Sequence, residues 1–191
     1  MDKDQVITFF DAMAQGWDAN QEHNERTIDF ILSVAGVSEG KHILDVACGT
    51  GILFPDYTDR GAKVTGVDIS SQMLRVANEK FPDIKTLCVD AENYAFSEKY
   101  DAVMIYNAFP HFINPQKLFA NLSSALNDNG RLTVAHGISE EEVEKCHATA
   151  AKDVSLPLPS KEKLADMMSE LFEVDVMISD EEKYIVSGVK R

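Results

Sequence analysis

Hydrophobic residues recur along this chain with two different periods, which predict helices and strands in turn. Spacings of three and four residues indicate amphipathic helices over 6–17 and 28–35, and the second helix is expected to end at Gly36. Short continuous apolar runs instead indicate strands that are buried on both faces. Five such runs follow, at His42–Val46, Lys63–Val67, Ile84–Val89, Ala102–Tyr106 and Arg131–Ala135.

Helical patterns separate these predicted strands. One covers 52–60 and another covers 71–80, and a third begins after the capping residue Asn114 and ends before Gly130. Strands that alternate with helices form βαβ units around a mostly parallel sheet. We therefore expect an α/β fold with a doubly wound sheet.

The C-terminal part of the chain breaks this alternation. A loop and a helix are expected over 136–152, where Ser139 begins the helix and Glu142 completes a capping box. Two further strands, Phe172–Ile178 and Lys183–Val189, are separated by a short acidic turn. Such a turn joins antiparallel strands, because a parallel pair needs a crossover of a dozen residues or more. The sheet is therefore expected to be seven-stranded and mostly parallel, with an antiparallel C-terminal hairpin.

Composition supports a single globular domain over residues 1–191. Hydrophobic residues make up 45% of the chain and charged residues 26%, and no apolar run is long enough to cross a bilayer. The formal charge of −14 argues against nucleic acid or an anionic membrane as partner. Three cysteines, far apart and odd in number, fit reduced thiols, and the N-terminus lacks the features of a signal peptide. We expect a cytoplasmic protein.

The stretch Cys48–Gly51 joins the first predicted strand to its helix, at the position where doubly wound sheets bind ligands. Its glycines, Gly49 and Gly51, allow the backbone to approach a ligand closely. A dinucleotide-binding turn has a third glycine three residues after the second, where this chain has Phe54. Asp45 precedes the turn at the expected mouth of the site, where its carboxylate would repel a pyrophosphate and attract a cationic ligand.

Two more carboxylates are expected at the ends of the next two strands. Asp68 closes the second, at the position where a carboxylate accepts hydrogen bonds from ribose hydroxyls. Asp90 closes the third, where its carboxylate could accept the amino hydrogens of adenine. Together with Asp45 they suit a cofactor that has adenosine at one end and a cationic amino acid at the other.

These residues belong to motifs that resemble a known family. The motifs are D-V-A-C-G-T-G at 45–51, V-T-G-V-D-I-S at 64–70, V-D-A-E at 89–92 and Y-D-A-V-M-I-Y-N at 100–107. They resemble the class I S-adenosylmethionine-dependent methyltransferases, in particular the small-molecule branch that contains the quinone C-methyltransferases. The segment F-F-D-A-M-A-Q-G-W-D at 9–18 is similar to the N-terminal helix that covers the cofactor in that branch.

The resemblance implies a Rossmann-like fold and a cofactor, S-adenosylmethionine, that leaves as S-adenosylhomocysteine. The implied cofactor-binding residues are Asp45, Ala47, Gly49 and Gly51 at the methionine end, Asp68 at the ribose, Ile69, Met73, Asp90 and Ala91 at the adenine, and Asn107 beside the transferring methyl. Trp17 is an additional candidate for a ligand contact. Within the domain we expect an N-terminal helical cap (1–36), a cofactor-binding core (37–137), an acceptor lid (138–160) and a C-terminal helix and hairpin (161–191).

Three histidines are expected on the acceptor side of the site. His111 follows the fourth predicted strand, His136 ends the fifth, and His147 lies on the helix after it, next to Cys146. A histidine there could deprotonate a hydroxyl or thiol, because its ordinary pKa is close to neutrality. Binding of a metalloid substrate is an alternative, but the spacing of the three matches no standard zinc pattern, so we expect no metal site.

The function that these observations favour is methyl transfer from S-adenosylmethionine to a small-molecule acceptor, by in-line displacement. An apolar, aromatic stretch after the fourth strand, and the absence of an N-P-P-Y type motif, favour a small, partly hydrophobic acceptor. Two alternatives stay open: a nicotinamide-dependent oxidoreductase, and a module that binds S-adenosylmethionine without catalysis. The sequence does not identify the acceptor, and a homodimer stays an open possibility.

Overall fold

The computed structural model describes residues 1–20, 24–149 and 151–191. Within them one seven-stranded sheet has the order β3-β2-β1-β4-β5-β7-β6. The strands are β1 (His42–Val46), β2 (Lys63–Asp68), β3 (Lys85–Cys88), β4 (Tyr100–Tyr106), β5 (Leu126–His136), β6 (Phe172–Ser179) and β7 (Tyr184–Lys190). β7 is antiparallel to β5 and β6, and the pairs among β1–β5 are parallel. The expected doubly wound mixed sheet is therefore confirmed.

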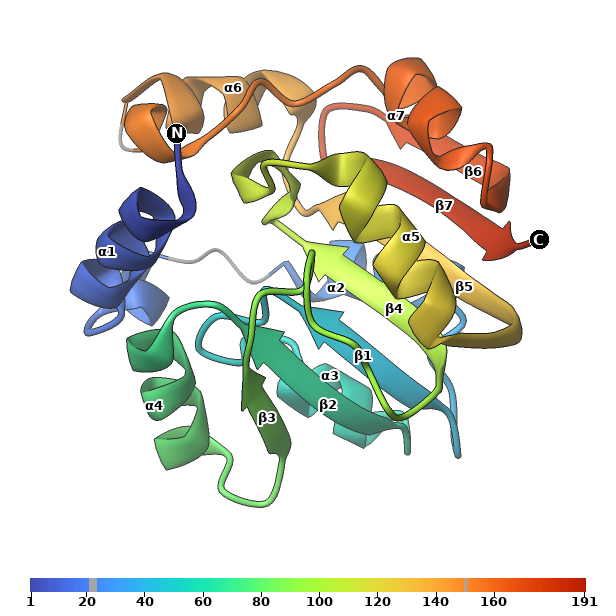
Figure 1. Cartoon of the computed structure of the whole chain (residues 1–191), viewed down its shortest axis with the longest axis horizontal. Helices are drawn as coiled ribbons and strands as arrows, with labels where there is room; N and C mark the ends of the chain where they lie inside the picture. Colours follow the sequence, from blue (N-terminus) through green and yellow to red (C-terminus); the bar gives the residue numbers. More distant parts are fainter. Residues whose placement is uncertain (21–23, 150) are drawn as a thin grey trace.

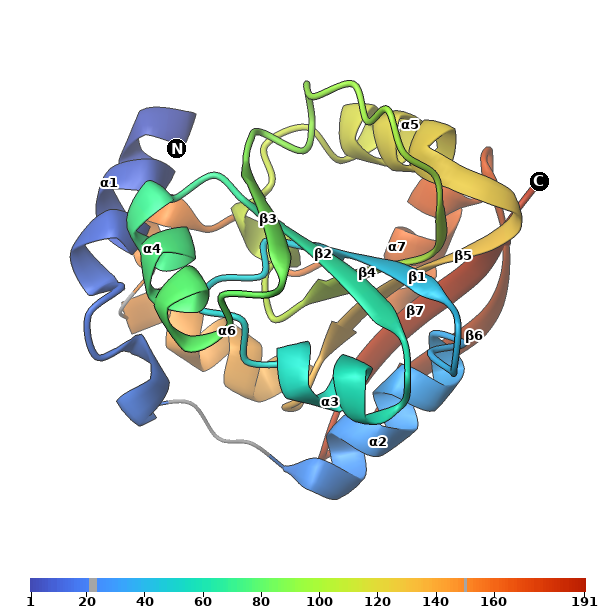
Figure 2. The same cartoon turned by 90° about the horizontal axis from the view of Figure 1, so that it is seen from below.

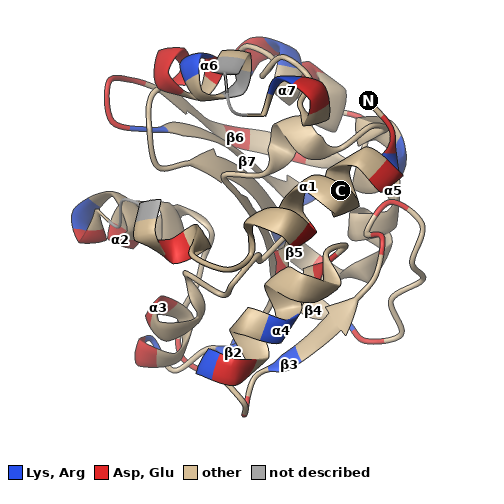
Figure 3. Cartoon of the chain, turned by 90° about the vertical axis from the view of Figure 1, so that its left-hand side faces the viewer, with Lys and Arg blue, Asp and Glu red and all other residues tan. Residues whose placement is uncertain are grey.

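Helices cover both faces of this sheet (Figures 1 and 2). They are α1 (Lys3–Met13), α2 (Glu25–Val34), α3 (Phe54–Asp59), α4 (Ser71–Lys80), α5 (Pro115–Ala125), α6 (Glu140–Thr149) and α7 (Lys161–Met168), with the 3₁₀ turns η1 (Trp17–Asn20), η2 (Phe109–His111) and η3 (Lys152–Val154). In Figure 2, α5 and α7 lie on one side of the sheet and α2 and α3 on the other. Charged residues lie mainly on the helices and connecting loops, while the ribbon of the strands is mostly uncharged (Figure 3).

The expected helix caps are present. The Asn114 side chain accepts a hydrogen bond from the Lys117 N–H at 3.0 Å and so begins α5. Ser139 and Glu142 exchange the two hydrogen bonds of a capping box, both at 3.3 Å. These local contacts explain why the helix starts could be predicted from the sequence.

Several element boundaries differ from the prediction, and two of these differences have an evident structural cause. α3 begins at Phe54 rather than two residues earlier, because the glycine turn continues through hydrogen bonds from Gly51 N–H to the Cys48 carbonyl and from Phe54 N–H to the Gly51 carbonyl. β5 begins at Leu126, which pairs with Tyr100, although the residues that follow Leu126 are polar. Pairing with β4, a tertiary contact, extends this strand beyond its apolar run.

The core has one cluster on each face of the sheet. Alternate residues of β1 belong to different clusters: Leu44 to the larger and Ile43 to the one that contains Phe54. Phe54 is completely buried, and its ring lies against two glycines. A Cβ atom on Gly51 would come within 2.6 Å of the ring, and one on Gly66 of β2 would do the same. The aromatic residue at the third-glycine position thus requires glycine at both places.

We expect Gly66→Ala to destabilise the fold by about 1–3 kcal/mol, since its Cβ would overlap the Phe54 ring and lie 2.9 Å from the Cys48 sulfur. Urea unfolding measures this loss. The control is the same substitution in a Phe54→Leu background, where part of the ring is gone and the cost of the extra methyl should shrink. An equal cost in both backgrounds would show that the ring is not the obstacle.

Candidate active site at the carboxyl ends of the strands

The glycine turn after β1 has the backbone geometry of a close ligand contact. Ala47, Gly49 and Gly51 have positive φ angles of 58°, 55° and 80°. A Cβ on Gly49 would meet no atom of the described chain within 4 Å, so this side of the turn faces open space. The turn therefore presents bare backbone at the topological switch point between β1 and β4.

Asp68 at the end of β2 holds this turn in place. Its carboxylate accepts the Gly49 N–H and the Ser70 N–H, both at 2.8 Å. Burial raises the pKa of Asp68 to about 6, although these two N–H donors lower it, and the charge of Asp11 raises it further. One side chain thus joins the β1 turn to the start of α4.

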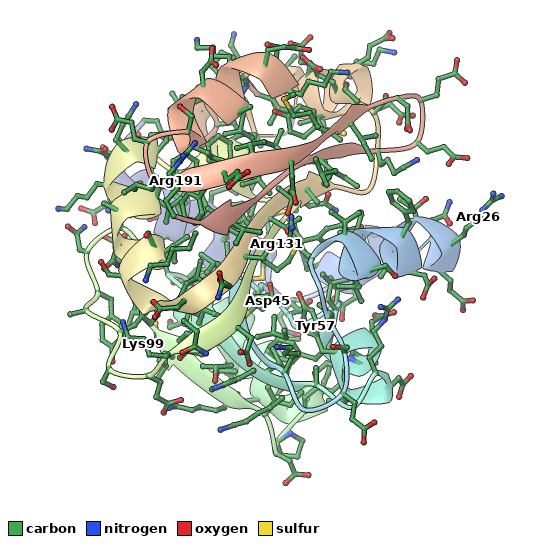
Figure 4. The ribbon with its side chains drawn as sticks, turned by 90° about the vertical axis from the view of Figure 1, so that its right-hand side faces the viewer. Arg26, Asp45, Tyr57, Lys99, Arg131 and Arg191 are labelled. Atoms are coloured by element: carbon green, nitrogen blue, oxygen red, sulfur yellow. The ribbon has the colours of Figure 1, made fainter. Side chains whose placement is uncertain are left out.

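Asp45 lies deeper than expected. It occupies β1 between Gly66 and Met104 and is 3% exposed. Figure 4 shows it in the interior beside Tyr57 of α3. Burial first, and then the charge of Asp68, raise the pKa of Asp45 to about 8, and the nearby Tyr57 hydroxyl opposes this. Asp45 is thus buried within β1, on the same side of the strand as Ile43, rather than exposed at the turn. Its expected role at the methionine end of a cofactor stays a prediction.

Asp90 lies just beyond β3, which ends at Cys88, one residue before the expected end at Val89. Its carboxylate binds the Lys3 ammonium and the Asn93 side-chain amide, and it accepts the Glu92 N–H at 3.0 Å. Burial opposes ionisation of Asp90, but Lys3 and Asn93 outweigh it and lower its pKa. The carboxylate is therefore charged and faces α1.

Asn107 links the ends of β4 and β5. It has a positive φ of 53°, its N–H donates to the Ala135 carbonyl at 2.9 Å, and its side-chain oxygen accepts the Gly137 N–H at 3.0 Å. A Cβ on Gly137 would overlap the Tyr106 hydroxyl. The left-handed backbone at Asn107 is thus fixed by partners on the neighbouring strand.

The remaining expected cofactor residues surround the same strand ends. Ile69 is half-buried, Met73 is buried, and the carbonyl of Ala91 accepts a hydrogen bond from the Asn121 side chain at 2.7 Å. Trp17 begins η1 and packs edge-on against Phe10 of α1 at 5.6 Å between ring centres. Trp17 thus packs η1 against α1 within the N-terminal segment, and its contact with a ligand stays a prediction.

The segment α1–η1 lies over these strand ends and contacts α4 and η3. Asp11 accepts hydrogen bonds from the Ser70 hydroxyl at 2.6 Å and the Gln72 N–H at 3.1 Å. Asp18 accepts a hydrogen bond from the Thr50 hydroxyl and pairs with Lys80 at 2.7 Å. Polar groups of the N-terminal segment are thus bound directly to the glycine turn and to α4.

The acceptor-side histidines have different surroundings. His111 is half-buried in η2, its Nδ1 lies 2.8 Å from the Val154 carbonyl, and its ring packs edge-on against Phe10 at 4.8 Å. His136 is 2% exposed at the end of β5 and packs 6.0 Å from the Tyr184 ring. The side chain of His147, on α6, lies outside the described residues.

Two carboxylates of the site were not predicted from the sequence. Glu92 is 4% exposed and accepts the N–H groups of Ile113 at 2.7 Å and Asn114 at 2.9 Å. Asp11 binds Ser70, as described above. Each belongs to a motif quoted in the sequence analysis, but the partners of these carboxylates are 20 or more residues away, which no local pattern reveals.

The open glycine turn and the carboxylates around it suit an adenosyl ligand with a cationic amino-acid end. The Gly49 side of the turn is open, Asp68 and Asp90 follow adjacent strands, and a cation near Asp45 and Asp68 would favour their ionised forms. Among residues 1–20, 24–149 and 151–191, no group of three or more His, Cys, Asp or Glu side chains could hold a metal ion. In the same described part, no helix has the length and apolar character needed to cross a membrane.

Comparison with known proteins agrees with this geometry. Residues 43–130 match the family model described as a methyltransferase domain. The chain is 30% identical over 138 residues to a demethylmenaquinone methyltransferase of Renibacterium salmoninarum, covering 69% of this chain and 58% of the relative. It is 28% identical over 144 residues to a ubiquinone biosynthesis O-methyltransferase of Idiomarina loihiensis, covering 69% and 59%. The chain thus spans less than two thirds of the length of these relatives.

A solved structure is similar over nearly the whole chain. The N-methyltransferase NodS of Bradyrhizobium japonicum, in complex with S-adenosylhomocysteine, superposes with a TM-score of 0.71 over 97% of both chains at 13% identity, which supports the fold. Fold, glycine turn and strand-end carboxylates together have the arrangement of a class I S-adenosylmethionine-dependent methyltransferase domain. Residues 43–130 match the methyltransferase-domain family, and the chain resembles the quinone methyltransferases among its relatives.

The buried Asp45 carboxyl predicts that the ligand-free protein loses stability as pH rises. Its folded pKa of about 8 lies above the ordinary value of about 3.9, so the folded state binds more protons between these values. Asp45 therefore contributes stability that is complete below about pH 4 and is lost as pH rises toward 8. We expect Asp45→Asn to flatten this decline in urea titrations, while Asp59→Asn, an exposed residue of α3, leaves it unchanged. An unaltered slope in Asp45→Asn would contradict this.

Proposed function

We propose that this protein transfers a methyl group from S-adenosylmethionine to a small-molecule acceptor. The observation that carries the proposal is the pairing of an open glycine turn with Asp68, which fixes that turn through the Gly49 N–H. The match of residues 43–130 to the methyltransferase-domain family supports the same reaction. The two quinone methyltransferases to which the chain is similar support a ring-containing, partly apolar acceptor.

Different residues at the strand ends would bind different parts of S-adenosylmethionine. Asp68 would accept the ribose hydroxyls, Asp90 the adenine amino group, and the backbone at Gly49 and Gly51 would lie along the methionine end. Asp45 beneath the turn would become ionised near the positive charge of the ligand. Bound S-adenosylmethionine would supply a sulfonium-activated methyl, and the α1–η1 segment would exclude water from it.

Aromatic side chains favour an apolar acceptor beside Asn107. Phe10 of α1 packs edge-on against the half-buried His111 of η2, with ring centres 4.8 Å apart. The rings of Phe109 and Phe119, stacked at 5.8 Å, are buried in the core and join η2 to α5. Residues 154–156 close over this region, since the Leu156 N–H donates to the Pro110 carbonyl at 2.8 Å. This placement supports the expectation that 138–160 forms part of an acceptor lid.

His111 is the best-placed candidate for a general base. A carbonyl can only accept, so the contact with Val154 places the Nδ1 proton on His111 and makes Nε2 the basic nitrogen of the neutral ring. His111 is also half-buried and contacts the helix over the site, whereas His136 is almost completely buried. A base here would be needed for a phenolic or thiol acceptor.

We expect Asp68→Asn to weaken binding of S-adenosylhomocysteine at least about tenfold, because the amide loses one acceptor and the charge that ribose hydroxyls favour. Isothermal titration calorimetry measures this. The matched control is Asp101→Asn: Asp101 also accepts a backbone N–H, from His42 at 2.9 Å, but at the amino end of the sheet. Tight binding of NAD to the unchanged protein, with no binding of either adenosyl ligand, would instead support an oxidoreductase.

We expect His111→Gln to lower turnover about 100-fold while cofactor affinity stays the same, because a general base typically contributes this much. Formation of S-adenosylhomocysteine over a panel of phenols, quinols, thiols and amines provides the assay. His42→Gln, at the amino end of β1, is the control. Loss of turnover in His136→Gln but not in His111→Gln would move the base to His136. No turnover with any acceptor would favour a binding module without catalysis.

A further inference from the structure

Glu92 joins two parts of the molecule that are distant in sequence. Its Oε1 accepts the N–H groups of Ile113 and Asn114, at the start of α5, at 2.7 and 2.9 Å. Its Oε2 pairs with the ammonium of Lys3, the first residue of α1, at 2.8 Å. With 4% of its surface exposed, this carboxylate is compensated by those three donors. One buried side chain therefore holds both α1 and the segment that follows η2.

Lys3 is shared between Glu92 and Asp90. Burial lowers the pKa of Lys3, but the hydrogen bonds that its ammonium donates to both carboxylates raise this pKa above its ordinary value, so the ammonium stays charged. Asp90 already accepts from the Asn93 amide and the Glu92 N–H as well as from Lys3. A ligand that donates an amino hydrogen to Asp90 must therefore compete with Lys3.

Glu92 can keep Lys3 when that competition occurs. Its Oε1 is directed to backbone groups, which leaves Oε2 for the ammonium. The same α1 reaches the acceptor side through the contact of Phe10 with His111, and His111 lies just before the Glu92-bound N–H of Ile113. The position of α1 and the position of residues 111–114 are thus set by one carboxylate.

On the basis of the proposed function, we propose that Glu92 is a positioning residue for methyl transfer. When Asp90 binds the adenine amino group, Glu92 keeps its ion pair with Lys3 and so holds α1 over the cofactor. Because Glu92 also binds the backbone at Ile113 and Asn114, it couples the position of α1 to that of residues 111–114 on the acceptor side. Glu92 touches neither substrate directly. It acts by fixing the position of α1 relative to residues 111–114.

Three substitutions separate the ion pair of Glu92 with Lys3 from its hydrogen bonds to the backbone of Ile113 and Asn114. Glu92→Gln keeps an oxygen for the N–H groups of Ile113 and Asn114 but loses the charge that retains Lys3. Glu92→Ala loses both contacts. Lys3→Met removes the ion pairs with Glu92 and Asp90 and leaves the hydrogen bonds of Glu92 to the backbone intact. Glu98→Gln, which breaks the exposed ion pair with Lys85, is the control.

Amide hydrogen exchange with and without S-adenosylhomocysteine tests the coupling. In the unchanged protein, the ligand should increase protection of both α1 and residues 111–114. Glu92→Gln should show near-normal protection of α1 without ligand, because Lys3 still pairs with Asp90, but should lose the ligand-induced increase there. Lys3→Met should loosen α1 even without ligand. Glu92→Ala should lower protection of residues 113 and 114 in both states.

Calorimetry should show about fivefold weaker binding of S-adenosylhomocysteine in Glu92→Gln and unchanged binding in Glu98→Gln, as expected for loss of a partly buried ion pair. Urea unfolding of each variant confirms that it is folded. Equal affinity and equal ligand-induced protection in Glu92→Gln and the unchanged protein would overturn the role of Glu92. Absence of S-adenosylhomocysteine binding to the unchanged protein would overturn the proposed function itself, and this inference with it.

Discussion

The hydrogen bond from the Gly49 N–H to the Asp68 carboxylate is the contact on which the site depends. It joins the turn after β1 to the end of β2, and the same carboxylate accepts the Ser70 N–H at the start of α4. Ser70 in turn donates to Asp11, so the helix over the site is connected to the turn beneath it. The backbone groups that would face a ligand are therefore fixed before the ligand arrives, which reduces the entropy lost on binding.

The buried carboxyl groups show how the fold balances stability against binding. Burial disfavours the charged forms of Asp45 and Asp68 most, and a neighbouring carboxylate adds to this effect at each: Asp68 at Asp45, and Asp11 at Asp68. A cationic ligand would reverse the balance, because it favours both charges at once. In the ligand-free protein, ionisation of these buried carboxyl groups is thus unfavourable in free energy, and a positively charged ligand would make it more favourable. An anionic pyrophosphate would instead make the ionisation of Asp45 and Asp68 still less favourable.

Phe54 explains how this turn differs from a dinucleotide-binding turn. Its ring fills the space between α3 and β2 that a third glycine would leave for closer helix packing, and it needs Gly51 and Gly66 beside it. Cys48 packs in the same cluster, where burial raises the pKa of its thiol well above the ordinary value. The thiol is therefore a packing group here rather than a nucleophile.

The sequence by itself determined the order of strands and helices, the helix caps and the antiparallel hairpin, because hydrophobic period and short-range hydrogen bonds set these locally. It also indicated the glycine turn and the carboxylates at 68 and 90, since strand ends of a parallel sheet meet at one edge. Only the tertiary structure decided that Asp45 lies beneath the turn and that Glu92 and Asp11 bind distant partners. Their positions depend on strand pairing and on the path of α1, and neither is encoded within a few residues.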